Sequence, residues 1–168
     1  MIQQTVLRLV CVSLLMLLIP PAVADGLSDA SRLLRVTSAG ELFEETANQQ
    51  TRDIIRTYVS IVNMSVQITL PDQIRDDIAE CYRIMYAWEK FEPGIAQLLA
   101  DNLSQHELRL LIDFYRNRGL PPAEIQAFKS TIAKADDIQL LISDYLFANS
   151  GGCVAQDTRS ILSYINQK

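Results

Sequence analysis

The sequence predicts an all-α protein: an irregular antiparallel helical bundle in one domain. Apolar residues recur at spacings of three and four along most of the chain, which is the pattern of helices that each bury one face. The alternating pattern of a strand is confined to residues 62–68, which we interpret as the last turns of a helix. Proline, glycine and capping residues mark the helix ends and leave only short connections between them.

The first 24 residues have the layout of a secretory signal peptide. Arg8 precedes an almost unbroken apolar run over Leu9–Ile19, and Ala22-Val23-Ala24 offers small residues to a signal peptidase. This run is shorter than the about 20 residues that span a bilayer. We therefore expect cleavage after Ala24, a single helical domain over residues 25–168, no stable membrane insertion after cleavage, and a periplasmic or secreted location. A retained membrane anchor is the alternative.

The first two expected helices precede Pro71. The earlier one lies around Leu27–Leu34, and a longer helix begins at Thr37 or Ser38. The longer helix must end before Pro71, because proline disfavours helical backbone in the residue that precedes it. Pro71 itself suits the first turn of the following helix, where its missing N–H would have had no partner.

The helix that follows Pro71 carries apolar residues every three or four positions as far as Trp88. We expect the run Glu92-Pro93-Gly94 to break this helix, because proline and glycine both destabilise a helix interior. After the break, a separate helix is expected around Ile95–Leu99.

The clearest helix start in the sequence is at Ser104. The Ser104 side chain can accept a hydrogen bond from the backbone N–H of Glu107, while the Glu107 side chain reaches back to Ser104 in a reciprocal capping box. An apolar stripe follows this start. We expect Gly119 to end the helix as a left-handed cap.

Further helix boundaries are expected in the last third of the chain. Pro121-Pro122 begins a helix, and the run Asp136–Gln139 caps its continuation. Gly151-Gly152 forms a hinge before a short closing helix around Ile161–Ile165. The side chains expected to face inward in this region are Ile125, Phe128, Ile132, Leu141, Ile142, Tyr145 and Leu146.

Two cysteines, Cys81 and Cys153, remain once the signal peptide and its Cys11 are removed. An even pair in an exported protein favours one disulfide bond. The bond would close a loop of about 72 residues and stabilise the fold by about 4 kcal/mol in the chain-entropy model. Two free thiols are the alternative, whereas a redox-active pair would need a Cys-x-x-Cys motif that is absent.

Composition excludes several classes of function. Removal of Arg8 with the signal peptide changes the net charge from −5 to −6, so we expect no nucleic-acid partner. One histidine, His106, and two cysteines cannot build the common zinc sites. The sequence has no nucleotide-binding or hydrolase motif. We therefore expect no catalytic residue, no metal and no cofactor.

A candidate surface for a partner protein lies on the helix that follows Pro71. Asp72, Asp76 and Glu80 are spaced four apart and share one face of that helix. Tyr86 and Trp88 follow near its end, and aromatic side chains with a polar tip are common interface anchors. We interpret these five residues as a docking surface for a basic partner. The alternatives are a solvated acidic face and aromatic residues that belong to the core.

Several runs of the sequence resemble a bacterial exported family named domain of unknown function 2059. They are Leu33-Leu34-Arg35-Val36-Thr37, Leu103-Ser104-Gln105-His106-Glu107-Leu108, and Ile112-Asp113-Phe114-Tyr115 followed by Gly119. The chain departs from the family pattern where a proline is usual, because Arg116-Asn117-Arg118 stands between the Phe-Tyr pair and the glycine. The resemblance implies an exported helical protein, and it transfers no site because the family has no assigned activity.

These observations favour a non-enzymatic periplasmic protein that binds another protein, with no particular oligomeric state specified. Its sharpest form is an immunity protein or inhibitor of an envelope toxin or hydrolase, since an acidic surface speeds association with a basic target. The second class is a carrier of a hydrophobic ligand in a cavity between helices. The third is an enzyme built on carboxylates that face each other in a cleft.

Overall fold

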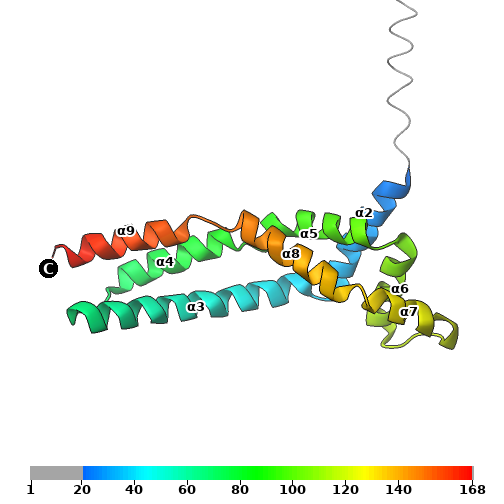
Figure 1. The fold of residues 1–168 in the computed structure, drawn as a ribbon, viewed down its shortest axis with the longest axis horizontal. Coiled ribbons are helices and arrows are strands. Elements are labelled where there is room, and N and C mark those ends of the chain that lie inside the picture. The colour runs from blue at the N-terminus through cyan, green and yellow to red at the C-terminus, as the bar shows by residue number, and fades with distance from the viewer. Residues whose placement is uncertain (1–20, 168) are drawn as a thin grey trace, which may run out of the picture.

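The computed structural model describes residues 21–167, and it confirms the all-α prediction, since no strand occurs among them. The molecule is elongated, and one long helix, α3, runs along much of its length (Figure 1). The elements in chain order are α2 (Pro21–Val36), α3 (Ala39–Val66), α4 (Asp72–Met85), α5 (Trp88–Asn102), α6 (Gln105–Asn117), the 3-10 helix η1 (Pro122–Glu124), α7 (Ile125–Ile132), α8 (Ala135–Asn149) and α9 (Cys153–Ile165).

Most of the expected signal peptide, residues 1–20, lies outside the described residues, and residues 21–24 begin α2. Within residues 21–167 no helix combines the length and the apolar character needed to cross a membrane. The expected helix around Leu27–Leu34 corresponds to α2, and the long helix that was expected to stop before Pro71 corresponds to α3. The alternating residues 62–68 do belong to the end of α3 as far as Val66, and Gln67 closes it in a left-handed conformation (φ 57°).

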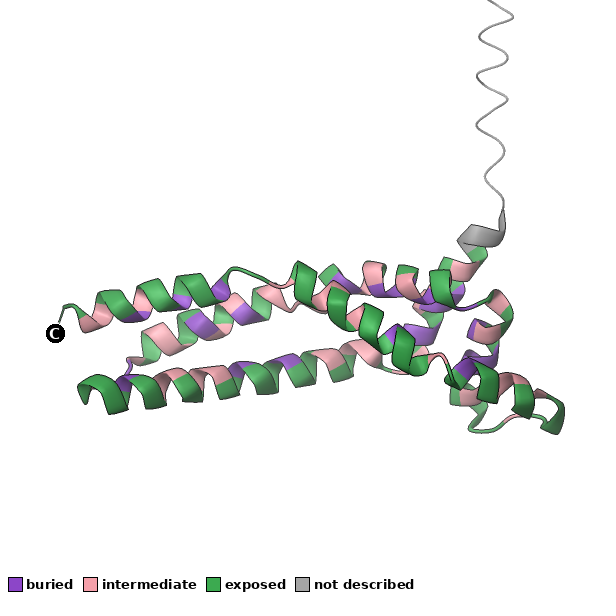
Figure 2. Cartoon of the chain, in the orientation of Figure 1, coloured by how far each residue is buried: buried purple, intermediate pink, exposed green. Residues whose placement is uncertain are grey.

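Two separate apolar clusters, one toward each end of the molecule, form the core (Figure 2). Cluster 1 joins α2, α5, α6 and α8 through Ala30, Leu33, Leu34, Phe91, Ile95, Ala96, Leu99, Leu103, Leu108, Leu111, Ile112 and Ile138. Cluster 2 joins α3, α4 and α9 through Val62, Leu70, Ile78, Tyr82, Cys153 and Ile161. Tyr86 is half-buried and packs against both clusters, so it lies between them.

The predicted helix break at Glu92-Pro93-Gly94 is wrong. The break lies earlier, because α4 ends at Met85 and α5 starts at Trp88 and continues through Pro93. Lys90 Nζ donates to the carbonyl oxygen of Ile84 at 2.6 Å, which places a cation on the carbonyl end of α4. Pro93 removes one backbone hydrogen bond from α5, but burial of the flanking residues Phe91 and Ile95 in cluster 1 offsets this loss.

Gly94 serves helix packing rather than helix termination. A Cβ atom at this position would overlap with the ring of Tyr145, which belongs to α8. The absence of a side chain therefore lets α5 and α8 approach closely. Tyr145 uses this space to reach the ring of Phe91, with the two ring centroids 6.2 Å apart in an edge-to-face arrangement.

The predicted capping box at the start of α6 is confirmed. Ser104 Oγ accepts from the backbone N–H of Glu107 at 3.3 Å, and the Ser104 N–H donates to Glu107 Oε2 at 2.8 Å. Lys134 Nζ, from the turn before α8, also lies 2.8 Å from a Glu107 oxygen. Its hydrogen bond, with those from Ser104, lowers the pKa of Glu107 to about 2. One side chain thus fixes α6 and ties it to α8.

Four other expectations about the second half of the chain are wrong. The run Asp136–Gln139 does not cap α8, because Lys134 precedes this helix and no side chain caps its start. The left-handed cap of α6 is Arg118 (φ 51°) and not Gly119. Ile125 and Ile132, which were expected to face inward, are 46 % and 47 % exposed, because the short helix α7 packs mainly on α6, where Phe128 contacts the ring of Phe114. Leu141 is also 39 % exposed, while Ile142, Tyr145 and Leu146 do pack against cluster 1.

Replacement of Gly94 by alanine should destabilise the protein. A glycine-to-alanine change in a helix interior normally stabilises by about 1 kcal/mol, but here the new methyl group meets Tyr145, and overpacking of this kind costs about 1–3 kcal/mol. Urea unfolding followed by circular dichroism measures the change. Gly26→Ala in α2 is the matched control, because nothing lies within 4 Å of its Cβ position and no loss is expected. A Gly94→Ala variant as stable as the control would contradict this account of the packing.

The low pKa of Glu107 predicts a specific dependence of stability on pH. A carboxyl group whose pKa is depressed on folding stabilises the protein above its unfolded pKa of 4.5 and loses that contribution as the pH falls toward 2. Glu107→Gln should therefore cost about 1–2 kcal/mol at neutral pH, and the difference from wild type should shrink on acidification. Exposed Glu89 supplies the control variant, Glu89→Gln. A difference that is independent of pH would show that the Glu107 charge is not involved.

Candidate functional site

The acidic residues predicted as a docking surface do share the exposed side of α4, but two of them form ion pairs with arginines of the same helix. Asp72 pairs with Arg75, and Glu80 pairs with Arg83 at 2.5 Å, each three residues along the helix. The hydrogen bond from Arg83 lowers the pKa of the Glu80 carboxyl. Asp76 between them is exposed. The stripe therefore carries less net negative charge than the spacing of its acids indicates.

Tyr86 and Trp88 lie in an aromatic group at the middle of the molecule. The ring centroid of Tyr86 is 6.2 Å from that of Tyr82 and 6.5 Å from that of Phe43, and Trp88 lies 5.5 Å from Phe43. Both side chains are half-buried. They line different surface grooves: Tyr86 lines one groove between α3 and α4 and another between α3 and α8, whereas Trp88 lines a third near the start of α3.

The predicted disulfide bond between Cys81 and Cys153 is present, with the two Cα atoms 5.9 Å apart. It joins α4 to the first residue of α9. His106 is exposed at the start of α6, 3.7 Å from a carboxylate oxygen of Glu124. In residues 21–167 no three His, Cys, Asp or Glu side chains are grouped so that they could hold a metal ion.

One buried carboxylate, Asp157 of α9, was missed in the sequence. It is 1 % exposed and lies within cluster 2, where burial raises its pKa although Tyr82 and Tyr58 act on it as hydrogen-bond donors. The sequence did indicate that this carboxylate is buried. Residues four apart share a helix face, and Asp157 lies midway between two apolar residues at that spacing, Cys153 and Ile161.

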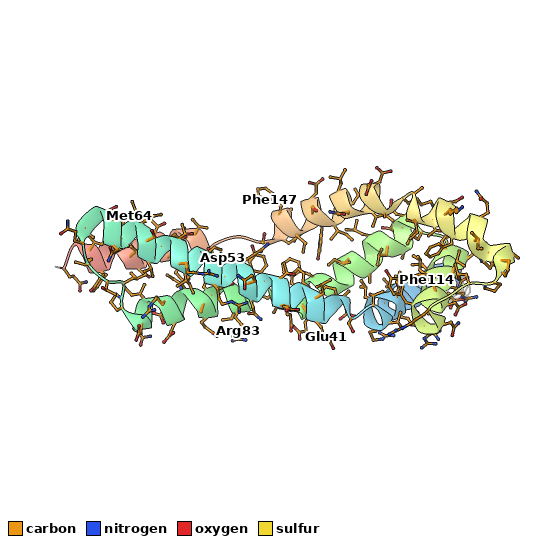
Figure 3. All side chains as sticks on the ribbon, turned by 90° about the horizontal axis from the view of Figure 1, so that it is seen from below. Glu41, Asp53, Met64, Arg83, Phe114 and Phe147 are labelled. Atoms are coloured by element: carbon orange, nitrogen blue, oxygen red, sulfur yellow. A yellow bond between two sulfur atoms is a disulfide. The ribbon has the colours of Figure 1, made fainter. Side chains whose placement is uncertain are left out.

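The most unusual surface belongs to α8, which is apolar on two opposite sides. Its inner side packs Ile138 into cluster 1, whereas Leu140 and Phe147 on the opposite side are 65 % and 85 % exposed. Asp136, Leu140, Asp144 and Phe147 follow one another at spacings of four, four and three, so they form one face, which we call the outer stripe of α8. Figure 3 shows Phe147 near the C-terminal end of α8 at the outer edge of the molecule.

A groove of about 320 Å³ lies beside the outer stripe, between α8 and α3. No charged residue lines it; its wall includes Phe43, Thr46, Tyr86, Ser143, Leu146 and Phe147. Asp136 and Asp144 are exposed, and neither has an ion-pair partner within residues 21–167. Lys134, the basic residue just before α8, is already bound to Glu107. The stripe and groove thus combine apolar area with uncompensated negative charge.

Comparisons with protein-family models, with curated proteins and with solved structures found no match for this chain. The geometry of the chain itself is therefore the basis for a functional proposal.

The exposure of Phe147 predicts that it contributes little to stability. Phe147→Ser should change the free energy of unfolding by less than about 0.5 kcal/mol, as for other surface substitutions. Phe91→Ala, which truncates a ring that is 1 % exposed in cluster 1, should cost about 3–5 kcal/mol. Urea unfolding of the two variants tests this directly. A large loss for Phe147→Ser would mean that the side chain belongs to the core.

Proposed function

We propose that the protein is a non-enzymatic protein-binding module and that it binds its partner through the outer stripe of α8 and the adjoining groove. The observation that carries this proposal is the exposure of Leu140 and Phe147 on a helix whose other side already packs in the core. A helix that is apolar on both sides is normally covered on both sides. Exposed apolar area of this kind marks interaction sites in proteins.

The charges beside these residues indicate the chemistry of the partner. Asp136 and Asp144 alternate with Leu140 and Phe147 along the outer stripe, and the helix contributes no basic residue. A partner segment with apolar residues spaced between lysines or arginines would complement this pattern. Opposite charges of this kind mainly speed association and align the two surfaces. The net negative charge of the chain acts in the same direction.

Export is part of the proposal. The Cys81–Cys153 bond supports it, because disulfides persist in the periplasm and outside the cell and are rare in the cytosol. Within that compartment, neutralisation of a basic toxin or hydrolase, as by an immunity protein or inhibitor, is the form of the proposal that fits an acidic chain. Membership of the family named domain of unknown function 2059 likewise stands as a proposal, supported by the sequence runs around Leu33 and Phe114.

A carrier of hydrophobic ligands is the weaker candidate. Carrier sites enclose most of the ligand surface within a cavity. Here the uncovered apolar side chains, Leu140 and Phe147, lie on an outward face. That arrangement suits a second protein surface better than a small molecule.

A capture experiment tests the proposed surface. Immobilised wild-type protein should retain one stoichiometric partner from an oxidised bacterial envelope extract, and the Leu140→Ser/Phe147→Ser double variant should lose at least about 90 % of it, because interface anchors of this size contribute 2 kcal/mol or more. Met64→Ser is the matched control, since Met64 is an apolar side chain of α3 that is 81 % exposed and lies away from α8. Equal retention by all three proteins would refute the assignment of the surface.

The charge component has its own readout once the partner is purified. Asp136→Lys/Asp144→Lys should slow association about tenfold or more at low salt, and the effect should diminish as salt is added. The matched control reverses two acids of α4, in Asp76→Lys/Glu80→Lys. If the control variant slowed association more than the α8 variant, the binding surface would lie on α4. If neither variant slowed association, electrostatic attraction would play no part in binding.

A further inference from the structure

The last described helix, α9, is attached to the rest of the molecule in a distinctive way. It lies alongside α4 in Figure 1, and it follows the short segment Ser150–Gly152, in which Gly152 has a positive φ of 107°. The disulfide bond joins Cys153, its first residue, to Cys81 of α4. The glycine-containing connection to α8 and the disulfide bond to α4 are therefore both at the N-terminal end of α9.

Asp157, one turn after Cys153, opposes the docking of α9. Its carboxylate is buried in the interface with α3 and α4, and its Oδ2 atom has no hydrogen-bond partner within the described residues. The titratable groups that act on it are Tyr58 from α3 and Tyr82 from α4, both uncharged near neutral pH, and no cation of residues 21–167 forms an ion pair with it. An ionised carboxylate in such a site is costly, whereas the protonated form is not.

We propose that α9 is a releasable arm, which the Cys81–Cys153 bond keeps docked at neutral pH and which reduction of that bond sets free unless Asp157 is protonated. This device is independent of the α8 surface. Release would uncover the cluster 2 residues that α9 now shields, including Ile78 and Tyr82.

The reduction is an ordinary thiol–disulfide exchange with a dithiol reductant. One thiolate of the reductant attacks Sγ of Cys81, which belongs to the half-buried residue of the pair whereas Cys153 is buried, and the bond between the two cysteines breaks. The second thiolate then displaces Cys81 from the mixed disulfide. Overall, the protein gains two electrons and two protons as two thiols, and the reductant becomes a disulfide.

The direction of the pH dependence follows from burial. Burial raises the pKa of Asp157 above its ordinary value of 3.8, so the docked state of α9 binds the proton more tightly than the released state. In the reduced protein, docking is therefore strongest at acidic pH and weakens as the pH rises through the raised pKa. In the oxidised protein the disulfide holds α9 in place throughout.

Trypsin provides a direct test, because Arg159 is the basic residue within α9 and a docked helix resists cleavage. At about pH 8, the dithiol-reduced wild type should be cut after Arg159 at least about tenfold faster than the oxidised protein. Reduced Asp157→Asn, which removes the buried charge, should be cut at nearly the oxidised rate. Reduced Asp113→Asn, which removes an exposed charge of α6, is the matched control and should behave as the reduced wild type.

A second measurement needs no substitution at Asp157. Hydrogen exchange of the α9 amides in the reduced wild type, normalised to intrinsic exchange rates, should show greater protection at about pH 4, close to the ordinary pKa of 3.8, than at about pH 7.5. Two results would overturn the proposal: equal cleavage of the oxidised and reduced wild type, or protection of reduced α9 that is the same at both pH values.

Discussion

Contacts among aromatic rings at the middle of the molecule hold its two apolar clusters in one structure. The ring of Tyr86 lies 6.2 Å from Tyr82 of cluster 2 and 6.4 Å from Phe91 of cluster 1. Phe43 brings α3 into the same group, and Tyr145 brings α8 into it through Phe91. Each such pair contributes about 0.5–1.5 kcal/mol beyond the burial of its area. Because α8 is positioned by this group, the direction of its outer stripe depends on it as well.

Features of the fold with a local cause could be predicted from the sequence. Helical spacing of apolar residues decides the fold class, and the reciprocal hydrogen bonds of Ser104 and Glu107 need only residues three apart. The Cys81–Cys153 bond was expected from the two cysteines that cleavage after Ala24 would leave, and the structure contains it. Of the candidate site, the shared exposed face of the α4 acids was predictable for the same reason, because it depends on helix periodicity alone.

Features decided by long-range contacts could not be predicted. Gly94 resembles a helix breaker in sequence, and only the approach of Tyr145 from α8 reveals it as a packing residue. The outer stripe was missed because the sequence analysis considered only the inward side of this helix, to which it assigned Leu141 and Leu146. It made no prediction for Phe147, which is 85 % exposed. The charge of the α4 face, in contrast, has a local cause that was overlooked, because Arg83 lies three residues after Glu80 on the same helix and pairs with it.

The order of the helices has a consequence for how the chain is made. Cluster 2 takes its residues from α3 and α4 and then from α9, with the whole of α5 to α8 in between. During synthesis the α3–α4 pair is therefore complete about 70 residues before the helix that covers it, and its apolar side and the thiol of Cys81 remain uncovered for that time. Cluster 1 has α2, α5, α6 and α8 available earlier, so the chain can assemble that end first and close the other end last.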